Sequence, residues 1–166
     1  MTTSKNLKNA FVGESRANRK YLAFAERAEQ EGLLQIARLF RAAARAETVH
    51  ALTHLQAMNG VRSTAENLQE AIAEENFGCQ EIYPRYVATA MDEGAKRAML
   101  SFNNAMEVEK VHYRLYTEAL EQVRSGEDLP PENIYVCSVC GNTVMGQPPE
   151  KCPVCEAPKE KFDEVQ

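Results

Sequence analysis

The sequence predicts an all-α four-helix bundle followed by a small cysteine-rich domain. Apolar residues recur at spacings of three and four almost without interruption from residue 4 to residue 124, which is the period of helices that bury one face. Residues 125–133 (SGEDLPPEN) are polar and contain Pro130-Pro131, so they read as a linker. Short β-prone pieces and four of the five cysteines follow. We therefore expect a bundle over 1–124, a linker over 125–133 and a second domain over 134–166.

Turn signals divide the first domain into four helices. Gly32 interrupts the first apolar pattern, Asn59-Gly60 ends the second, and Asp92-Glu93-Gly94 separates the third from the fourth. Ser63-Thr-Ala-Glu66 is a capping box that opens the third helix. Pro84 lies inside that helix, and we expect it to bend the helix without dividing it.

Composition and charge argue against several classes of function. The chain has 166 residues, of which 44% are apolar and 26% charged, with a net charge of −5 and basic residues scattered along the helices. This balance argues against nucleic acid or an anionic membrane as the main partner. No apolar run approaches the roughly 18 residues that span a bilayer. The N-terminal residues lack the apolar stretch of a signal peptide, so we expect a cytoplasmic protein.

Charged side chains occupy one core position in each predicted helix. These are Glu14, Glu47, Glu75 and Glu109. A buried carboxylate must be protonated, paired or bound to metal. In the second and fourth helices a histidine follows three residues later, His50 and His112, and this spacing points both side chains the same way.

Glutamate from two helices and Glu-x-x-His from the other two is the ligand arrangement of bundle-core di-iron and di-manganese sites. Four carboxylates offset the charge of two divalent ions, and one imidazole on each metal leaves open positions. The alternative without metal is that each glutamate lies at the edge of a helix–helix interface and extends its carboxylate into solvent. All six residues match the helical spacing of the core, and the glutamates of each helix pair lie at the same level of the bundle. This agreement favours the metal site. For His54, one turn beyond His50, we expect an ordinary core-edge histidine.

The second domain carries two cysteine pairs, Cys137-Ser-Val-Cys140 and Cys152-Pro-Val-Cys155, with eleven residues between them. Two such pairs make a tetrahedral four-thiolate metal site. The spacing does not distinguish zinc from iron. Zinc would make the domain a structural module, and iron would make it a one-electron carrier. Apolar residues around the pairs can cover the sulfurs. These are Ile134, Tyr135, Val136, Val144 and Phe162.

The motifs together resemble a rubrerythrin over nearly the whole chain. The resembling segments are Phe11-Val-Gly-Glu-Ser-Arg-Ala-Asn, Glu47-Thr-Val-His50-Ala, Glu75-Asn-Phe with Ile82-Tyr-Pro, Glu107-Val-Glu109-Lys-Val-His112, and the final Cys-x-x-Cys-Gly and Cys-Pro-x-Cys pairs. The resemblance implies a ferritin-like di-iron domain and a rubredoxin-like domain with one iron. It also implies reduction of hydrogen peroxide to water in oxidative-stress defence, with electrons from a redox protein or an NAD(P)H-dependent reductase.

The resemblance also assigns ligand roles. It implies that Glu47 and Glu109 bridge both irons, that Glu14 and His50 complete one iron, and that Glu75 and His112 complete the other. The mononuclear iron would bind Cys137, Cys140, Cys152 and Cys155. Tyr21 and Tyr83 match tyrosines that hydrogen-bond the ligand carboxylates and could support proton transfer.

One position departs from the family pattern. Rubrerythrins usually carry a further glutamate three residues after the third-helix ligand, and that glutamate exchanges with the second-helix histidine as the iron changes oxidation state. Here the position is Gly78. Without this glutamate there are three alternatives. His50 stays bound in both oxidation states, water takes the place of the missing ligand, or Glu81 reaches the iron from the next turn.

Two other functions share these ligands. A ferroxidase or an oxygen-reducing di-iron protein would use the same six residues. A non-enzymatic protein, with a structural metal-binding or electron-transfer role, would hold zinc at the cysteines. Metal content, the visible spectrum, and turnover with peroxide against dioxygen separate these functions.

The connection between the second and third helices bears on the oligomer. A ferritin-like order runs these helices parallel, which requires a crossover of roughly 30 Å at 1.5 Å per residue. Residues 59–63 reach only about 17 Å at full extension. The bundle is therefore either a plain up-down-up-down bundle or a homodimer that exchanges helix pairs, and we expect the exchanged homodimer.

Overall fold

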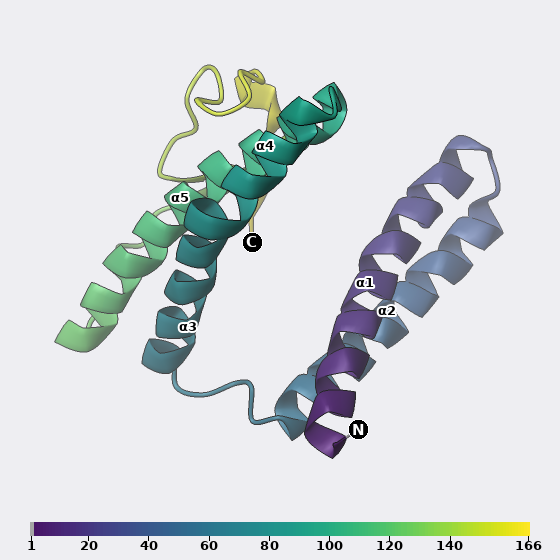
Figure 1. Ribbon diagram of the computed structural model, residues 1–166, viewed down its shortest axis with the longest axis horizontal. Coiled ribbons are helices and arrows are strands. Elements are labelled where there is room, and N and C mark those ends of the chain that lie inside the picture. Colours follow the sequence, from purple (N-terminus) through teal and green to yellow (C-terminus); the bar gives the residue numbers. More distant parts are fainter. Residues whose placement is uncertain (1) are drawn as a thin grey trace. The chain divides into compact units, whose positions relative to one another are not determined.

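The computed structural model describes residues 2–166, and the chain divides into two compact units (Figure 1). The first ends at Arg62 and the second begins at Ser63. Within residues 2–166, no helix combines the length and apolar character needed to cross a membrane.

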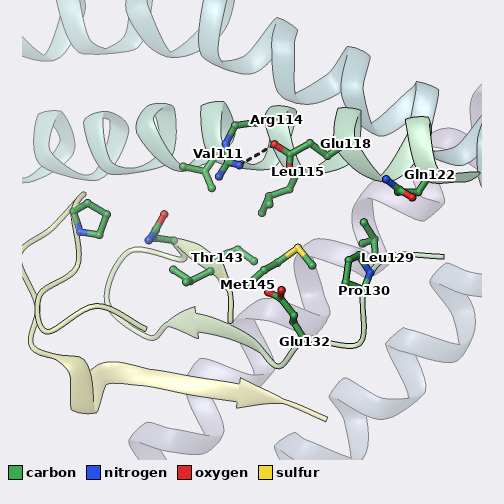
Figure 2. A pocket seen from close by; sticks show the side chains of 13 residues that line it. Val111, Arg114, Leu115, Glu118, Gln122, Leu129, Pro130, Glu132, Thr143 and Met145 are labelled. Carbon is green, nitrogen blue, oxygen red and sulfur yellow. Dashed lines mark hydrogen bonds and ion pairs between the residues drawn. The ribbon is translucent and has the colours of Figure 1, made fainter. Parts of the chain in front are cut away.

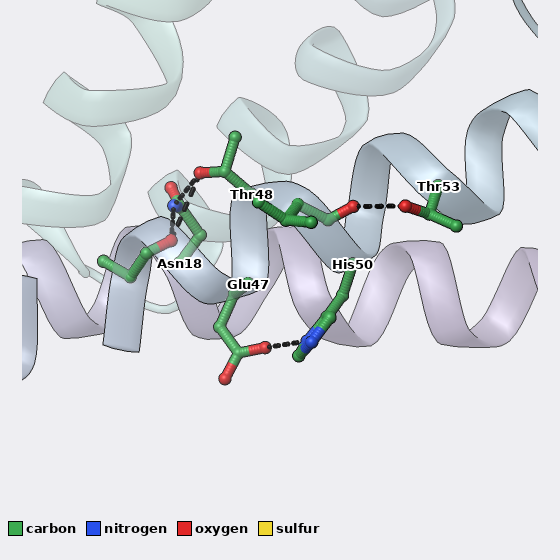
Figure 3. Close-up of polar contacts among 7 residues, drawn as sticks. Asn18, Glu47, Thr48, His50 and Thr53 are labelled. Atoms are coloured by element: carbon green, nitrogen blue, oxygen red, sulfur yellow. Dashed lines mark hydrogen bonds and ion pairs between the residues drawn. The ribbon is translucent and has the colours of Figure 1, made fainter. Parts of the chain in front are cut away.

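The first unit is a hairpin of two long helices, α1 (Thr3–Gln30) and α2 (Leu34–Ala57). The two helices pack through buried alanines, which let their backbones approach closely. Asn18 is buried between them and donates from Nδ2 to the Ala44 carbonyl oxygen at 2.7 Å and to Thr48 Oγ1 at 2.8 Å (Figure 3). This side chain fixes the register of the hairpin, since its donors meet one particular turn of α2.

The second unit begins with a helix broken by a π-helical turn. It runs as α3 (Thr64–Phe77), the π segment η1 (Gly78–Ile82) and α4 (Tyr83–Asp92), and it packs against α5 (Lys96–Ser125). The predicted capping box is present at Ser63 and Glu66. Pro84 lies in the first turn of α4, directly after η1. Because Pro84 has no N–H, it cannot hydrogen-bond back to the preceding turn. The disturbance expected at Pro84 is found just before it, in the π-helical segment Gly78–Ile82.

A three-stranded antiparallel sheet organises the C-terminal part of the second unit. Its strands are β1 (Ile134–Cys137), β2 (Thr143–Met145) and β3 (Phe162–Val165), in the order β2-β1-β3, with a short 3-10 turn, η2 (Lys159–Lys161), before β3. Phe162, Tyr135 and Val144 pack around the cysteines, as their apolar character predicted. Strand β2 contacts α5, so the cysteine module lies against the helix that carries Glu109 and His112.

Candidate metal centres

The first unit gathers Glu14 from α1 with Glu47 and His50 from α2. Their candidate ligand atoms all lie within 4.8 Å of one another. His50 Nδ1 lies 2.9 Å from Glu47 Oε2 (Figure 3). This hydrogen bond, together with one from Glu14, lowers the pKa of Glu47. Two carboxyl groups this close need a shared proton or a cation between them, so these three residues are arranged as half of a candidate metal site.

The second unit places Glu75 from α3 near Glu109 and His112 from α5. His112 Nδ1 lies 3.5 Å from Glu75 Oε1. Burial raises the pKa of Glu75, and His112 opposes that rise. Burial also raises the pKa of Glu109, and the charge of Glu75 adds to it. These three side chains are less tightly gathered than those of the first unit. Within residues 2–166, the groups whose ligand atoms all lie within 4.8 Å of one another are Glu14 with Glu47 and His50, and the four cysteines of the C-terminal module.

Glu109 provides the test of whether these residues fit a cation. Its Oε2 is buried without a hydrogen-bond partner. The carboxylate lies against the bare backbone of Gly78, where an added Cβ would overlap Glu109 Oε2. Tyr83 also lies close to this carboxylate, and burial followed by the Glu109 charge raises the pKa of Tyr83. An unpaired buried carboxylate oxygen beside a second carboxylate is an arrangement that a bound cation would stabilise.

Replacing Glu109 with glutamine is expected to stabilise the metal-free protein at high pH only. The raised pKa of Glu109 means that its stabilising contribution is complete below the ordinary value of 4.5 and is lost as pH rises through the raised value. We expect Glu109→Gln to match the parent at pH 4. At pH 8 it should gain at most about 1 kcal/mol, allowing for solvent screening. Urea unfolding of both proteins at the two pH values measures the difference.

The matched control is Glu107→Gln on the same helix. Glu107 is exposed and pairs with Lys110 at 2.6 Å, so its substitution should not stabilise the protein at pH 8. An equal effect of Glu109→Gln at pH 4 and pH 8 would contradict the assignment of a costly buried charge.

Gly78→Ala is expected to raise the stability of the metal-free protein by about 1 kcal/mol. Gly78 has helical dihedral angles, φ −59° and ψ −56°, so alanine gains helix propensity there. The atom that an added Cβ meets is the flexible end of Glu109, which can move. Thermal unfolding checks the gain, with Gly13→Ala as a control, because a Cβ there meets nothing within 4 Å. Destabilisation by Gly78→Ala alone would show that Glu109 is fixed in place.

The four cysteines of the C-terminal module form a preassembled tetrahedral site. Cys137 Sγ lies 3.7 Å from Cys155 Sγ, and Cys140 Sγ lies 3.6 Å from Cys152 Sγ. These separations are too long for disulfides, which measure about 2.05 Å. They match the edges of a tetrahedron whose metal–sulfur bonds are about 2.3 Å. All four cysteines are free and lie close enough to share one ion.

Each cysteine pair is built as the same turn. The residue after each pair, Gly141 or Glu156, has a positive φ, of 86° and 60°, and its N–H donates back to the carbonyl oxygen of the pair's first cysteine. Burial raises the pKa of Cys140 well above its usual range. Burial acts the same way on Cys152, but the N–H groups of Cys155 and Val154 outweigh it and lower that pKa. Four thiols this close can all ionise only when a cation offsets their charge, and the arrangement of the sulfurs fits one.

The remaining predicted residues have mixed outcomes. Tyr83 lies beside a predicted ligand, as described above. Tyr21 packs against Phe24 and Phe40, each with its ring centre 6.3 Å away, and its role toward a ligand carboxylate stays a prediction. The sequence reasoning missed Thr143, whose Oγ1 lies 2.9 Å from His112 Nε2. No spacing rule indicates this contact, because it depends on how the cysteine module lies against α5.

Comparison with known families gives two matches along the chain. The rubrerythrin family model matches residues 5–120, and the model of the rubrerythrin rubredoxin-like domain matches residues 135–163. Together they confirm the predicted ferritin-like and rubredoxin-like folds. Rubrerythrins contain a di-iron site and an Fe(Cys)4 site, and they are in general oxidoreductases.

Individual relatives agree with the family models. Rubrerythrin-2 of Clostridium acetobutylicum is 33% identical over 174 residues, which cover 96% of this chain and 95% of that protein. Nigerythrin of Nitratidesulfovibrio vulgaris is 33% identical over 97% of this chain and 85% of its own length. A nigerythrin structure in a mixed-valence state aligns with a TM-score of 0.59 and 32% identity, covering 99% of this chain and 87% of that chain. With its helical ligand motifs and its four-cysteine module, this chain belongs to the rubrerythrin family.

Proposed function

We propose that this protein reduces hydrogen peroxide to water at a di-iron site and receives the electrons through an Fe(Cys)4 centre, as a defence against oxidative stress. One observation carries the proposal. The two units each present two glutamates and one histidine, and the second unit also holds a preassembled four-thiolate site. Membership of the rubrerythrin family supports the same activity.

The proposed ligands divide by unit. Glu14, Glu47 and His50 come from the first, and Glu75, Glu109 and His112 from the second. We propose Glu47 and Glu109 as the bridging ligands. The cysteines would hold the third iron. Bound iron supplies the redox chemistry, two electrons for each peroxide at the paired site and one-electron transfers at the thiolate site.

The surrounding side chains handle position and protons. Reduction of one peroxide to two waters consumes two protons. The Tyr83 hydroxyl lies on the Glu109 carboxylate, so it can hold a proton beside the site and return it. The bare backbone at Gly78 gives the Glu109 carboxylate room to lie next to η1. Tyr21 is the corresponding proposal for the first half-site.

We further propose that the working form is a homodimer in which the first unit of one chain completes the site with the second unit of its partner. The connection between α2 and α3 contains too few residues to run the length of the bundle, so the two helices cannot be parallel within one chain. The hairpin of α1 and α2 leaves large apolar side chains exposed, which a neighbouring helix pair would cover. They include Val12, Leu34, Ile36, Leu39, Val49 and Leu52.

The activity is tested by following NADH oxidation and peroxide loss with iron-loaded protein and a supplied reductase. We expect peroxide consumption, with both the thiolate iron and the di-iron site cycling between oxidation states. A di-iron site that stays oxidised while the thiolate iron cycles would overturn the proposal. Faster turnover with dioxygen than with peroxide would favour an oxidase instead.

A further inference from the structure

His112 forms contacts through both ring nitrogens, and the two contacts face different parts of the second unit. Its Nδ1 faces Glu75 Oε1 at 3.5 Å, on the side of the proposed di-iron site. Its Nε2 lies 2.9 Å from Thr143 Oγ1, on strand β2 of the cysteine module. The side chain of His112 is only 27% exposed, so the ring is held between these two neighbours.

The hydroxyl of Thr143 has a second, longer contact besides the one to His112. Thr143 Oγ1 donates to the Gly141 carbonyl oxygen at 3.4 Å. When the hydroxyl gives its one hydrogen to Gly141, its oxygen can accept from His112 Nε2–H. With the proton on Nε2, Nδ1 keeps a lone pair that can bind a metal beside Glu75. Without a metal, the Glu75 carboxylate that faces Nδ1 favours a proton on Nδ1 instead, so Thr143 and Glu75 act on the ring in opposite directions.

The packing around this bridge holds the module against α5. Val108 on α5 is buried, and a Cβ placed on Gly141 would lie 3.9 Å from Val108 Cγ1. Figure 2 shows Thr143 on the module facing the helix that carries Val111, across a cavity lined by both parts. Thr143 follows Cys140 by three residues, so the bridge connects the loop of the second cysteine ligand to His112.

His50 provides a contrast within the same protein. Its Nδ1 pairs with Glu47 on its own helix, and its side chain is 56% exposed. The orientation of His50 therefore follows from the Glu-x-x-His spacing alone, whereas that of His112 also depends on the cysteine module.

We propose that Thr143 is a positioning residue that accepts a hydrogen bond from His112 Nε2–H, so that docking of the cysteine module favours the ring form whose Nδ1 can bind a metal in the bundle. This proposal rests on the proposed function, because that function identifies His112 as a ligand of the di-iron site. It adds that the two metal centres are coupled through one hydrogen bond, from His112 Nε2–H to Thr143 Oγ1, and that the module shapes the bundle site as well as supplying electrons to it.

The experiment uses the full chain with zinc at the cysteines and the bundle free of metal. The variants are Thr143→Val, which keeps the shape and removes the hydroxyl, and Thr143→Ser, which keeps the hydroxyl. Long-range proton–nitrogen NMR of 15N-labelled histidine reports the protonated nitrogen of each of the three rings. We expect a larger Nε2–H population at His112 in the parent and in Thr143→Ser than in Thr143→Val, where only Glu75 is left to hold a proton, on Nδ1. His50 and His54 should not change.

The same samples are then titrated with Co²⁺, followed by its visible bands. Loss of a group that orients a histidine ligand lowers metal affinity by roughly 10-fold or more, so Thr143→Val should bind that much more weakly and Thr143→Ser like the parent. Unchanged rings and affinity in Thr143→Val would overturn the proposal, as would equal losses in both variants, which would indicate packing. If the parent bundle binds no Co²⁺, the proposed function fails, while the NMR result still decides the role of Thr143.

Discussion

Replacing Cys152 with alanine is expected to remove the metal of the C-terminal module and to unfold that module while the helices persist. Cys152 is 1% exposed and lies with Cys137 and Phe162 in the core of the module. Three thiolates cannot complete a tetrahedral site, and a module this small has little other core. Structural metal contributes on the order of 10 kcal/mol to the folding of such modules, which exceeds the stability available without it.

The loss is measured by metal content, the visible absorption of thiolate iron and the NMR dispersion of residues in β1, β2 and β3. Helical circular dichroism should change little, because α1 to α5 lie outside the module. The matched control is Cys79→Ala, a second buried cysteine that lies in η1, which should leave the thiolate-iron absorption unchanged. Retention of that absorption in Cys152→Ala would show that the four cysteines do not act as one site.

The features that the sequence predicted correctly depend on short-range rules. Each helix could be predicted from apolar spacing, and the start of α3 from the capping box at Ser63. The cysteine turns follow from the spacing of each pair, because two residues between cysteines bring both sulfurs to one side. The Glu14, Glu47 and His50 group could also be predicted, since α1 and α2 form an antiparallel hairpin whose turn lies midway between the two glutamates.

The features that the sequence did not predict depend on contacts between distant segments or on local backbone geometry. The π-helical turn at Gly78–Ile82 has no apolar signature, because one widened turn shifts the phase of the helix without changing its composition. The place of the Glu109 carboxylate against Gly78 requires α3 and α5 to be packed first. The bridge between Thr143 and His112 requires the module to lie on α5, and no residue pattern in either segment indicates that arrangement.

Mixing two inactive variants is expected to restore metal binding if the site is shared between chains. Glu47→Ala removes a ligand of the first unit, and Glu109→Ala removes one of the second, so each variant alone should fail to load the di-iron site. In an exchanged heterodimer of the two, one site carries both substitutions and the other carries neither. With random association half of the dimers are heterodimers, so about one quarter of the parent loading should return. Iron content beyond that of the cysteine site, measured after the two variants are unfolded and refolded together, gives the fraction.

The control for this experiment is a mixture of Glu14→Ala with Glu47→Ala. Both substitutions lie in the first unit, so no pairing of these chains produces a site without a substitution, and no loading should return. A site built within one chain predicts no recovery in either mixture, because every chain then carries its own defect. Recovery in the first mixture alone therefore requires ligands from two chains, whereas failure of both mixtures, with the parent refolding to full loading, would rule out the exchanged dimer and favour a bundle closed within one chain.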